Sequence, residues 1–325
     1  MKKILTVILI LVILSTVLTG CQRSGSGGSN VIRVGFAQAK SDESDWRMAN
    51  TRSMLDAFNR SGFSLTLSDS NNDLAKQVAD VQSFIDQEFD YIVIAAVNME
   101  GWDTVLRNAQ RANIPVILVD RTMDSSVRDM WLTWVGPDFH LEGVQATDWM
   151  ERTFGNRQLN IVHLQGQLGA SAQVERSRAL AEGVTRNANW TMLAQQTGNW
   201  STDTSKQIMT SWIQQFGSAI TLVYAENDNM AVGAIQALQE AGMNVGLRHG
   251  GVAIISFDAN RWALDLTLQG LIDVNVECNP LHGPAVLQII ESHRRGVMPP
   301  KETIVEEEAF FAETITQEII DRRHY

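Results

Sequence analysis

Between residues 31 and 278 the chain alternates between short apolar strands and amphipathic helices, and this rhythm constrains its fold more than any other feature. The segment DYIVIAAV (90–97) is apolar on both faces of a strand, whereas 73–87 carries apolar residues at helical spacing. Strands that are apolar on both faces are typical of parallel sheets covered by helices on both sides. One such series spans 31–120 and a second spans 160–278. We therefore expect an α/β chain with two doubly wound parallel-sheet lobes.

The expected elements divide between the two series. The first series has strands at 31–37, 63–68, 90–97 and 114–120, and helices at 45–60, 73–87 and 102–112. The second has strands at 160–165, 191–196, 219–225, 251–258 and 271–278, and helices at 171–187, 202–216, 228–241 and 261–269. At roughly 100–200 residues per domain, a folded part from about Val31 to Tyr325 has room for two lobes.

The first thirty residues have the form of a secretory signal followed by a tether. Two lysines precede an apolar run (4–18), which is marginal for a membrane span of about 20 residues. The sequence Leu-Thr-Gly-Cys, ending at Cys21, resembles the bacterial lipobox, in which the cysteine is lipidated; an ordinary signal peptide with a chance cysteine is the alternative. We expect a signal peptide over 1–20, a flexible Gly/Ser-rich tether over 21–30, and a lipid anchor on Cys21 without a spanning helix.

Composition argues against nucleic-acid binding, an intrachain disulfide and a metal site. The formal net charge is −11, and it becomes about −13 without residues 1–20, which contain two lysines and no acid. An acidic chain without a basic stripe argues against nucleic-acid binding. Because Cys278 is the one cysteine outside the lipobox, we expect no intrachain disulfide, and its role stays open. The six histidines lack the close spacing of a zinc site, so we expect neither a metal nor a cofactor.

Polar residues follow almost every expected strand, and ligands of open parallel sheets bind beyond the carboxyl ends of the strands. These residues are Glu43, Trp46, Arg47, Asp120, Arg121, Arg176, Asn227, Asp258 and Asn279. Most carry forked hydrogen-bonding groups, which suit sugar hydroxyls because each hydroxyl both donates and accepts. The ring of Trp46 could cover the apolar C–H face of a sugar. A nucleotide is less suited, since the glycine-rich 166–171 lacks the P-loop lysine.

Each of these residues also has a structural interpretation. Asp45, Asp228 and Asp258 could be helix caps, which acidic residues after strands often are. Asp120 and Arg121 could form a private salt bridge at the end of their strand. From the residues alone, the salt bridge and the sugar pocket remain equally good interpretations of this pair.

Several segments together resemble a known family. They are VGFAQAKSDESDWRMAN from Val34, LVDRTMD (118–124), QGQLGASAQVERSRALAEG (165–183), VYAENDNMAVGAIQALQEAG (223–242), SFDA (256–259) and VECNPLHGPA (276–285). They resemble bacterial periplasmic sugar-binding proteins of the ribose/galactose type, the type I periplasmic binding proteins, and among these the galactofuranose-binding components of ABC importers. The resemblance covers essentially all of 31–325.

The resemblance implies a ligand site and a lobe division. The implied sugar contacts are Glu43, Trp46, Arg47, Asp120 and Arg121 from the first lobe, Arg176, Asn227 and Asp258 from the second, and Asn279 near the hinge. The segment after Pro280 is about one residue shorter than in galactofuranose binders, which puts Asn279 in doubt. The lobes would be 31–137 with 280–303 and 138–279 with 304–325, joined by a three-crossing hinge near Pro137, Pro280 and Ile304.

The resemblance also implies a function. The protein would be an extracytoplasmic, lipid-anchored monomer that captures a monosaccharide, galactofuranose-like or a related aldose, and delivers it to ABC permease subunits in the membrane. A sugar sensor that presents its ligand to a chemoreceptor or sensor kinase is the alternative. A glycosidase with paired carboxylates from Glu43, Asp120 and Asp258 is less favoured, because arginine neighbours would hold these acids ionised. A sugar-responsive repressor would need a helix-turn-helix where this chain has the signal and tether.

Overall fold

The computed structural model describes residues 31–325, of which 32–325 form one compact unit. The expected signal peptide, the tether and Cys21 lie outside the described residues. Within the described part, no helix combines the length and the apolar character needed to cross a membrane.

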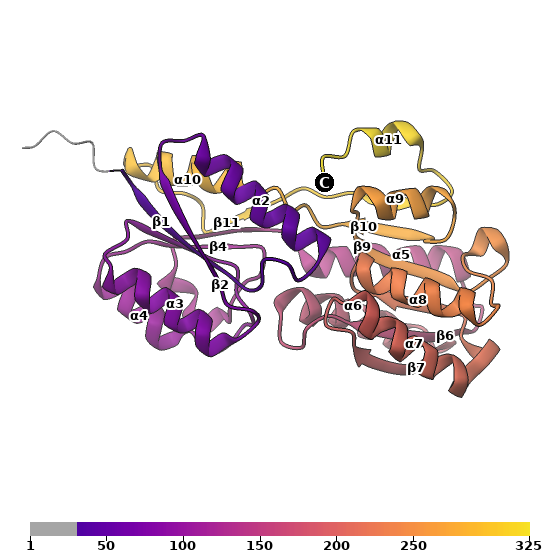
Figure 1. Ribbon diagram of the computed structural model, residues 1–325. Coiled ribbons are helices and arrows are strands. Elements are labelled where there is room, and N and C mark those ends of the chain that lie inside the picture. Colours follow the sequence, from indigo (N-terminus) through magenta and orange to yellow (C-terminus); the bar gives the residue numbers. More distant parts are fainter. Residues whose placement is uncertain (1–30) are drawn as a thin grey trace, which may run out of the picture. The chain divides into compact units, whose positions relative to one another are not determined.

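The first sheet has six parallel strands in the order β11-β5-β4-β3-β1-β2 (Figure 1). Its strands are β1 (Arg33–Gln38), β2 (Ser64–Asp69), β3 (Tyr91–Ile94), β4 (Val116–Val119), β5 (Thr133–Gly136) and β11 (Glu302–Ile304). Its helices are α2 (Asp45–Asn59), α3 (Leu74–Asp86), α4 (Asp103–Arg111) and α10 (Gly283–Arg294).

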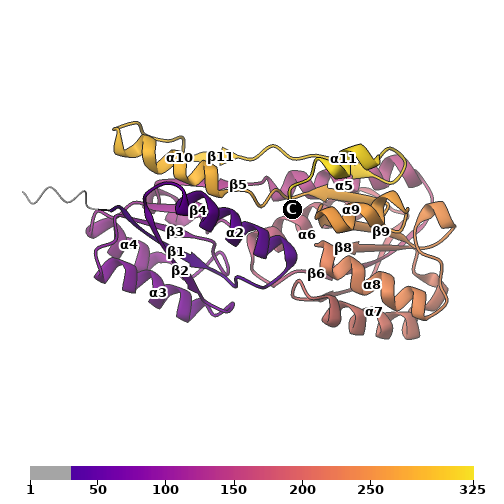
Figure 2. The ribbon, with the colours of Figure 1, turned by 45° about the horizontal axis from the view of Figure 1, so that its top comes forward.

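Helices cover both faces of this sheet, as Figure 2 shows, with α2 and α10 on one side and α3 and α4 on the other. Alternate residues of β3 serve the two sides. Ile92 and Ile94 pack with Phe84 of α3, whereas Val93 packs with Met54 of α2. This arrangement explains why the strand is apolar on both faces.

The second sheet has the order β12-β10-β9-β8-β6-β7, parallel except for β12, which pairs antiparallel with β10. Its strands are β6 (Leu159–Gln165), β7 (Trp190–Thr197), β8 (Leu222–Ala225), β9 (Ala253–Asp258), β10 (Val274–Glu277) and β12 (Ala309–Phe311). Its helices are α5 (Phe139–Phe154), α6 (Ser171–Arg186), α7 (Thr202–Phe216), α8 (Asp228–Glu240), α9 (Arg261–Leu268) and α11 (Gln317–Asp321), and three short 3-10 helices complete the described chain: η1 (Ser125–Met130), η2 (Gly217–Ala219) and η3 (Leu247–His249).

The chain passes between the two sheets three times: after β5 into α5, after β10 into α10, and between β11 and β12. The predicted fold class, two doubly wound parallel-sheet lobes joined by three crossings, is therefore confirmed. The sequence analysis assigned no elements over 125–159 or 280–325, where the structure has β5, α5, α10, β11, β12 and α11.

Candidate ligand-binding site

A pocket lies where the carboxyl ends of the two sheets face each other. It is lined from both lobes by Glu43, Ser44, Trp46, Arg47, Asp120, Arg121, Phe139, Ala172, Arg176, Trp200, Asn227, Asp258 and Cys278. The cavity between these side chains has a volume of about 30 Å³, room for a few water molecules.

The first turn of α2 presents Trp46 and Arg47 to the pocket. The helix begins there because the Ser44 hydroxyl accepts a hydrogen bond from the Arg47 amide at 3.2 Å, a typical N-cap. Both side chains are buried, and the Arg47 guanidinium lies 4.7 Å from the centre of the Trp46 ring. The Trp46 indole N–H donates to the carbonyl oxygen of Cys278. This bond ties α2 to the second crossing.

Four buried charges meet at the end of β4. Arg47 Nη2 lies 2.6 Å from Asp120 Oδ2, and Arg121 Nη2 lies 2.6 Å from Glu43 Oε2. The contact between Asp120 and Arg121 themselves is longer, 3.9 Å. They do not form a private salt bridge, because each makes its short contact with the opposite charge near the start of α2.

These ion pairs leave arginine donors free. Within residues 31–325, Arg47 Nη1 and Arg121 Nη1 are buried and have no hydrogen-bond partner. Burial lowers the pKa of Arg121, while Asp120 and Glu43 outweigh burial and raise the pKa of Arg47. Both side chains line the pocket, so their free N–H groups can serve a ligand oxygen.

Arg176 of α6 is the cation that the second lobe contributes. Its Nε lies 2.6 Å from Glu142 Oε2, its Nη1 donates to the Glu226 carbonyl at 2.6 Å, and its Nη2 lies 3.8 Å from Asp258 Oδ1. Nη2 has no hydrogen-bond partner in the described part of the chain. The second lobe thus also offers a buried N–H donor to the pocket.

Asp258 and Asn227 end β9 and β8. Burial raises the pKa of Asp258 well above its usual range, although Arg176 opposes this shift. The expectation that arginine neighbours hold the pocket acids ionised is therefore wrong for Asp258, because desolvation outweighs the single distant cation. Asn227 is also a helix cap, since its Oδ1 accepts from the Met230 amide at 2.9 Å. Asn227 therefore both caps α8 and lines the pocket.

Comparison with known proteins identifies the family. Residues 34–281 match the family described as periplasmic binding protein domain. The chain belongs to this family. Family membership agrees with a ligand pocket placed between two sheets of this topology.

Relatives within the family bind sugars. The chain is 32% identical to the galactofuranose-binding protein YtfQ of Escherichia coli, over 90% of this chain and 92% of the relative. It is 34% identical, with a TM-score of 0.82, to a Mycobacterium smegmatis protein solved with β-D-fucofuranose, over 87% and 92% of the two chains. It is 29% identical, with a TM-score of 0.82, to the Shewanella sp. ANA-3 arabinose-transporter component bound to α- and β-L-arabinofuranose, over 90% and 99%.

The structure adds pocket residues that the sequence analysis missed, chiefly Phe139 and Trp200. Trp200 has a left-handed backbone (φ +62°), and its ring fills the space beside Gly166, where an added Cβ would lie 1.9 Å from the ring. The run Gly-Asn-Trp after β7 is a turn signal that could have drawn attention to it. Phe139 is the first residue of α5, directly after a crossing, and carried no signal of this kind.

Asn279 is not brought to the pocket. Its Oδ1 accepts from the Leu281 amide at 2.9 Å, and its own amide donates to Glu307 Oε1 at 2.7 Å. The side chain thus bonds within the turn after β10 and is not among the residues that line the pocket, so its part in ligand binding stays a prediction. The other eight predicted side chains line the pocket together.

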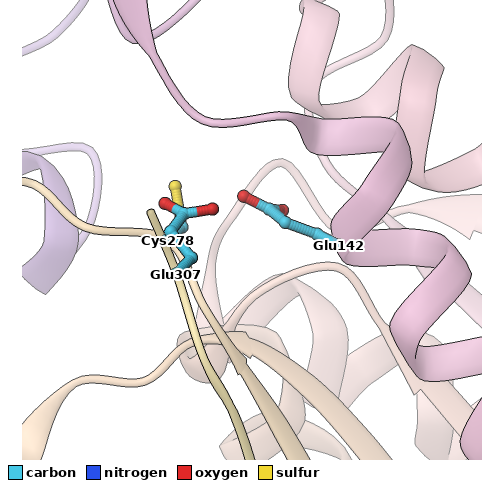
Figure 3. Close-up of side chains that lie close together, drawn as sticks. All are labelled: Glu142, Cys278 and Glu307. Atoms are coloured by element: carbon cyan, nitrogen blue, oxygen red, sulfur yellow. The ribbon is translucent and has the colours of Figure 1, made fainter. Parts of the chain in front are cut away.

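A cluster of the buried Glu142 and Cys278 with the half-buried Glu307 lies beside the pocket at the crossings (Figure 3). Their ligand-type atoms all lie within 4.8 Å of one another, the one such group found among residues 31–325. Figure 3 shows the two carboxyl groups pointing toward each other, with the Cys278 sulfur beside them. Because Arg176 already neutralises Glu142, the cluster suits protons better than a cation.

Proposed function

We propose that the protein is an extracytoplasmic solute-binding protein that captures a monosaccharide between its two lobes and delivers it to an ABC sugar importer. A furanose-ring aldose, galactofuranose-like or related, is the proposed ligand class. The names of the relatives support this class, since they bind galactofuranose, fucofuranose and arabinofuranose.

One observation carries the proposal: the pocket gathers buried arginine N–H donors without partners, within the described chain, from both lobes. Arg47 and Arg121 supply them from one side and Arg176 from the other. Leaving such donors buried and unpaired costs roughly 1–3 kcal/mol each, so a ligand with several oxygens gains by satisfying them. A sugar has these oxygens in a compact ring.

The remaining lining groups suit the other parts of a sugar. Asp258 lies at the pocket edge opposite the first lobe and can bond a hydroxyl in either protonation state. The rings of Trp46 and Trp200 offer apolar area for the C–H faces and exclude water. The ligand would thus contact both lobes at once, which is the condition for it to stabilise the closed state.

We propose binding and not catalysis. Glu43 and Asp120 each make a 2.6 Å ion pair with an arginine, which leaves neither free to deliver a proton to a leaving group. Asp258 has the raised pKa of a general acid but lacks a free carboxylate partner across the pocket. The sensor role stays the alternative, because it would use the same pocket.

The lipid anchor on Cys21, the signal peptide and the tether are proposals that depend on the sequence alone. A tethered lipoprotein would keep the binding unit near its membrane permease. We likewise propose that the protein is monomeric and that it has a membrane permease as its partner, in keeping with its family membership.

A thermal-shift screen tests the binding function. Residues 31–325 would be screened against D-galactose, D-fucose, L-arabinose, D-ribose and D-fructose, and against a galactofuranoside. A ligand that binds only the folded state increases the unfolding free energy by about 2.7 kcal/mol at 100 times Kd, and so raises the melting temperature. We expect a rise with at least one sugar, and its loss in Arg121→Ala. The control is Arg178→Ala, an exposed arginine of α6. No rise with any sugar would contradict the proposed ligand class.

A further inference from the structure

The hinge and the pocket are connected through two acids, one buried and one half-buried, that the binding function does not itself require. Glu142 lies in the first turn of α5, just after the first crossing, and Glu307 lies in the third crossing between β11 and β12. Neither side chain lines the pocket. Glu142 nevertheless makes the shortest side-chain contact of Arg176, the pocket cation of the second lobe.

The two carboxyl groups of this cluster are incompletely satisfied as anions. The Oε2 atom of Glu142 accepts a hydrogen bond from Arg176. Its buried Oε1 atom has no hydrogen-bond partner within residues 31–325 when both acids are ionised, because a carboxylate only accepts. Glu307 accepts the Asn279 amide through Oε1 and faces Glu142 with the rest of its carboxyl group (Figure 3). One proton between the two acids would turn this facing pair into an O–H···O hydrogen bond and satisfy the free oxygen.

Electrostatics place that proton on Glu307. Burial, together with the nearby Glu142, raises the pKa of Glu307 to about 11. Burial raises the pKa of Glu142 as well, but Arg176 opposes the shift there and favours the ionised form, whereas Glu307 has no cation in such close contact within the described chain. Burial also raises the pKa of the Cys278 thiol, so the sulfur is neutral. Two adjacent buried carboxylates cannot both be ionised at modest cost.

We propose that Glu142 and Glu307 are positioning residues for Arg176: a hydrogen bond between the two carboxyl groups fixes Glu142, and Glu142 directs the guanidinium into the pocket. The inference depends on the proposed sugar-binding function. It assigns the third crossing a role in affinity, because Glu307 belongs to that crossing and faces Glu142, the partner of Arg176.

The test is a comparison of isosteric and truncated variants. Glu307→Gln keeps an uncharged donor that can serve Glu142, so we expect Kd within about threefold of the wild type. Glu307→Ala removes the bond and should weaken binding roughly tenfold. Glu142→Gln removes the charge partner of Arg176 and should weaken it roughly 100-fold. The matched control is Glu306→Ala, an exposed neighbour on the same crossing.

Binding would be measured by calorimetry with the sugar that gives the largest thermal shift, D-galactose being the first probe. If Glu307→Gln loses as much affinity as Glu307→Ala, or if Glu307→Ala binds like the wild type, the proposal is overturned. Melting temperatures of the free variants separate affinity from folding, and Glu307→Gln alone decides if Glu307→Ala does not fold.

Titration with Co²⁺ provides a second test. A thiolate-to-cobalt absorption band would assign the cluster to a cation and overturn the proposal. If the wild type binds no sugar, the proposed function fails and this inference falls with it; a wild type that binds while Glu307→Ala binds equally well overturns the inference alone.

Discussion

At the scale of single residues, the pocket is built on strained backbone. Asp120 (φ +59°), Trp200 (φ +62°) and Asp258 (φ +99°) all lie in the left-handed region, which non-glycine residues seldom adopt. Each such residue costs on the order of 1–3 kcal/mol and persists only when its surroundings hold it. Strain at three lining residues is consistent with a site selected for binding at some expense of stability.

Asp228 holds the strained turn after β9. Its Oδ2 accepts hydrogen bonds from the Asn260 amide at 2.8 Å and from the Asn260 side chain at 2.9 Å, and its Oδ1 accepts from Ser256 at 2.6 Å and Asn275 at 2.7 Å. The Asn275 side chain in turn accepts from the Ala259 amide. The network thus fixes the residues that follow Asp258.

Asp228 also predicts a pH dependence of stability. Burial raises its pKa from 3.8 to about 6, so between about pH 4 and pH 6 the folded state holds a proton that the unfolded state has lost. Stability therefore falls as pH rises through this window, by roughly 3 kcal/mol, and this contribution is constant above it. Urea unfolding at pH 4, 5, 6 and 7 would compare the wild type with Asp228→Asn, which cannot titrate. A difference in unfolding free energy that stays constant from pH 4 to 6 would contradict the assignment.

At the scale of elements, the close packing of α5 on α6 positions Arg176. The two helices approach at Gly143, where an added Cβ would lie 2.6 Å from the Ala179 Cβ and 3.3 Å from the Arg176 Cα. A larger residue at this position must separate the helices. Because Arg176 belongs to α6 and its partner Glu142 belongs to α5, separation also loosens their ion pair.

Gly143→Ala should therefore lower both stability and affinity. Alanine in a helix interior by itself stabilises by about 1 kcal/mol relative to glycine, so a net loss of about 1–3 kcal/mol would report the clash. Urea unfolding and calorimetry with the sugar from the screen would measure the two effects. The matched double variant Gly143→Ala/Ala179→Gly relieves the closest contact and should recover part of the affinity. A single variant as stable as the wild type would show that the helices do not need this approach.

The sequence predicted those elements whose apolar pattern is long enough to show a period. Strands β1, β4 and β9 and helices α2, α7 and α8 lie within a few residues of their expected ranges. Strands β11 and β12 have three residues each, too few for a periodic signal. Helix α5 buries Glu142, Gly143 and Thr147 on its inner face, so its apolar stripe is interrupted by residues whose burial depends on tertiary partners.

The same distinction applies to the site. Parallel strands place their carboxyl ends at one edge of each sheet, so the positions of Asp120 and Asp258 predict that edge, while the choice of a pocket over a salt bridge or a cap depended on the family resemblance. Glu142 and Glu307 could not, because their role depends on a contact between segments 165 residues apart in the sequence (307 − 142). Asn279 has a short-range role, accepting a hydrogen bond from the Leu281 amide, that its position after a strand does not reveal.

At the scale of the whole molecule, several hydrogen bonds cross between the lobes outside the pocket. The Met99 amide donates to the Gly169 carbonyl at 3.1 Å, and the Thr122 amide donates to Ser171 Oγ at 3.0 Å. On another part of the rim the Asn229 side chain donates to Asp45 at 3.0 Å. Such bonds contribute about 1 kcal/mol each. We therefore expect a ligand that joins both sides to add most of the stability of the closed state.

Closure should therefore depend on the ligand reaching Arg176. We propose that the lobes, 31–137 with 280–303 and 138–279 with 304–325, move as two bodies about the three crossings. A sugar held only by Arg47 and Arg121 would bind one lobe and leave the open–closed equilibrium where it was, since a ligand shifts an equilibrium only through differential affinity. Small-angle scattering should show a smaller radius of gyration for the wild type and for the control Arg178→Ala at saturating sugar, but no decrease for Arg176→Ala. If Arg176→Ala binds weakly and still closes fully at saturation, contacts other than this guanidinium draw in the second lobe. The proposal that closure depends on the ligand reaching Arg176 is then wrong.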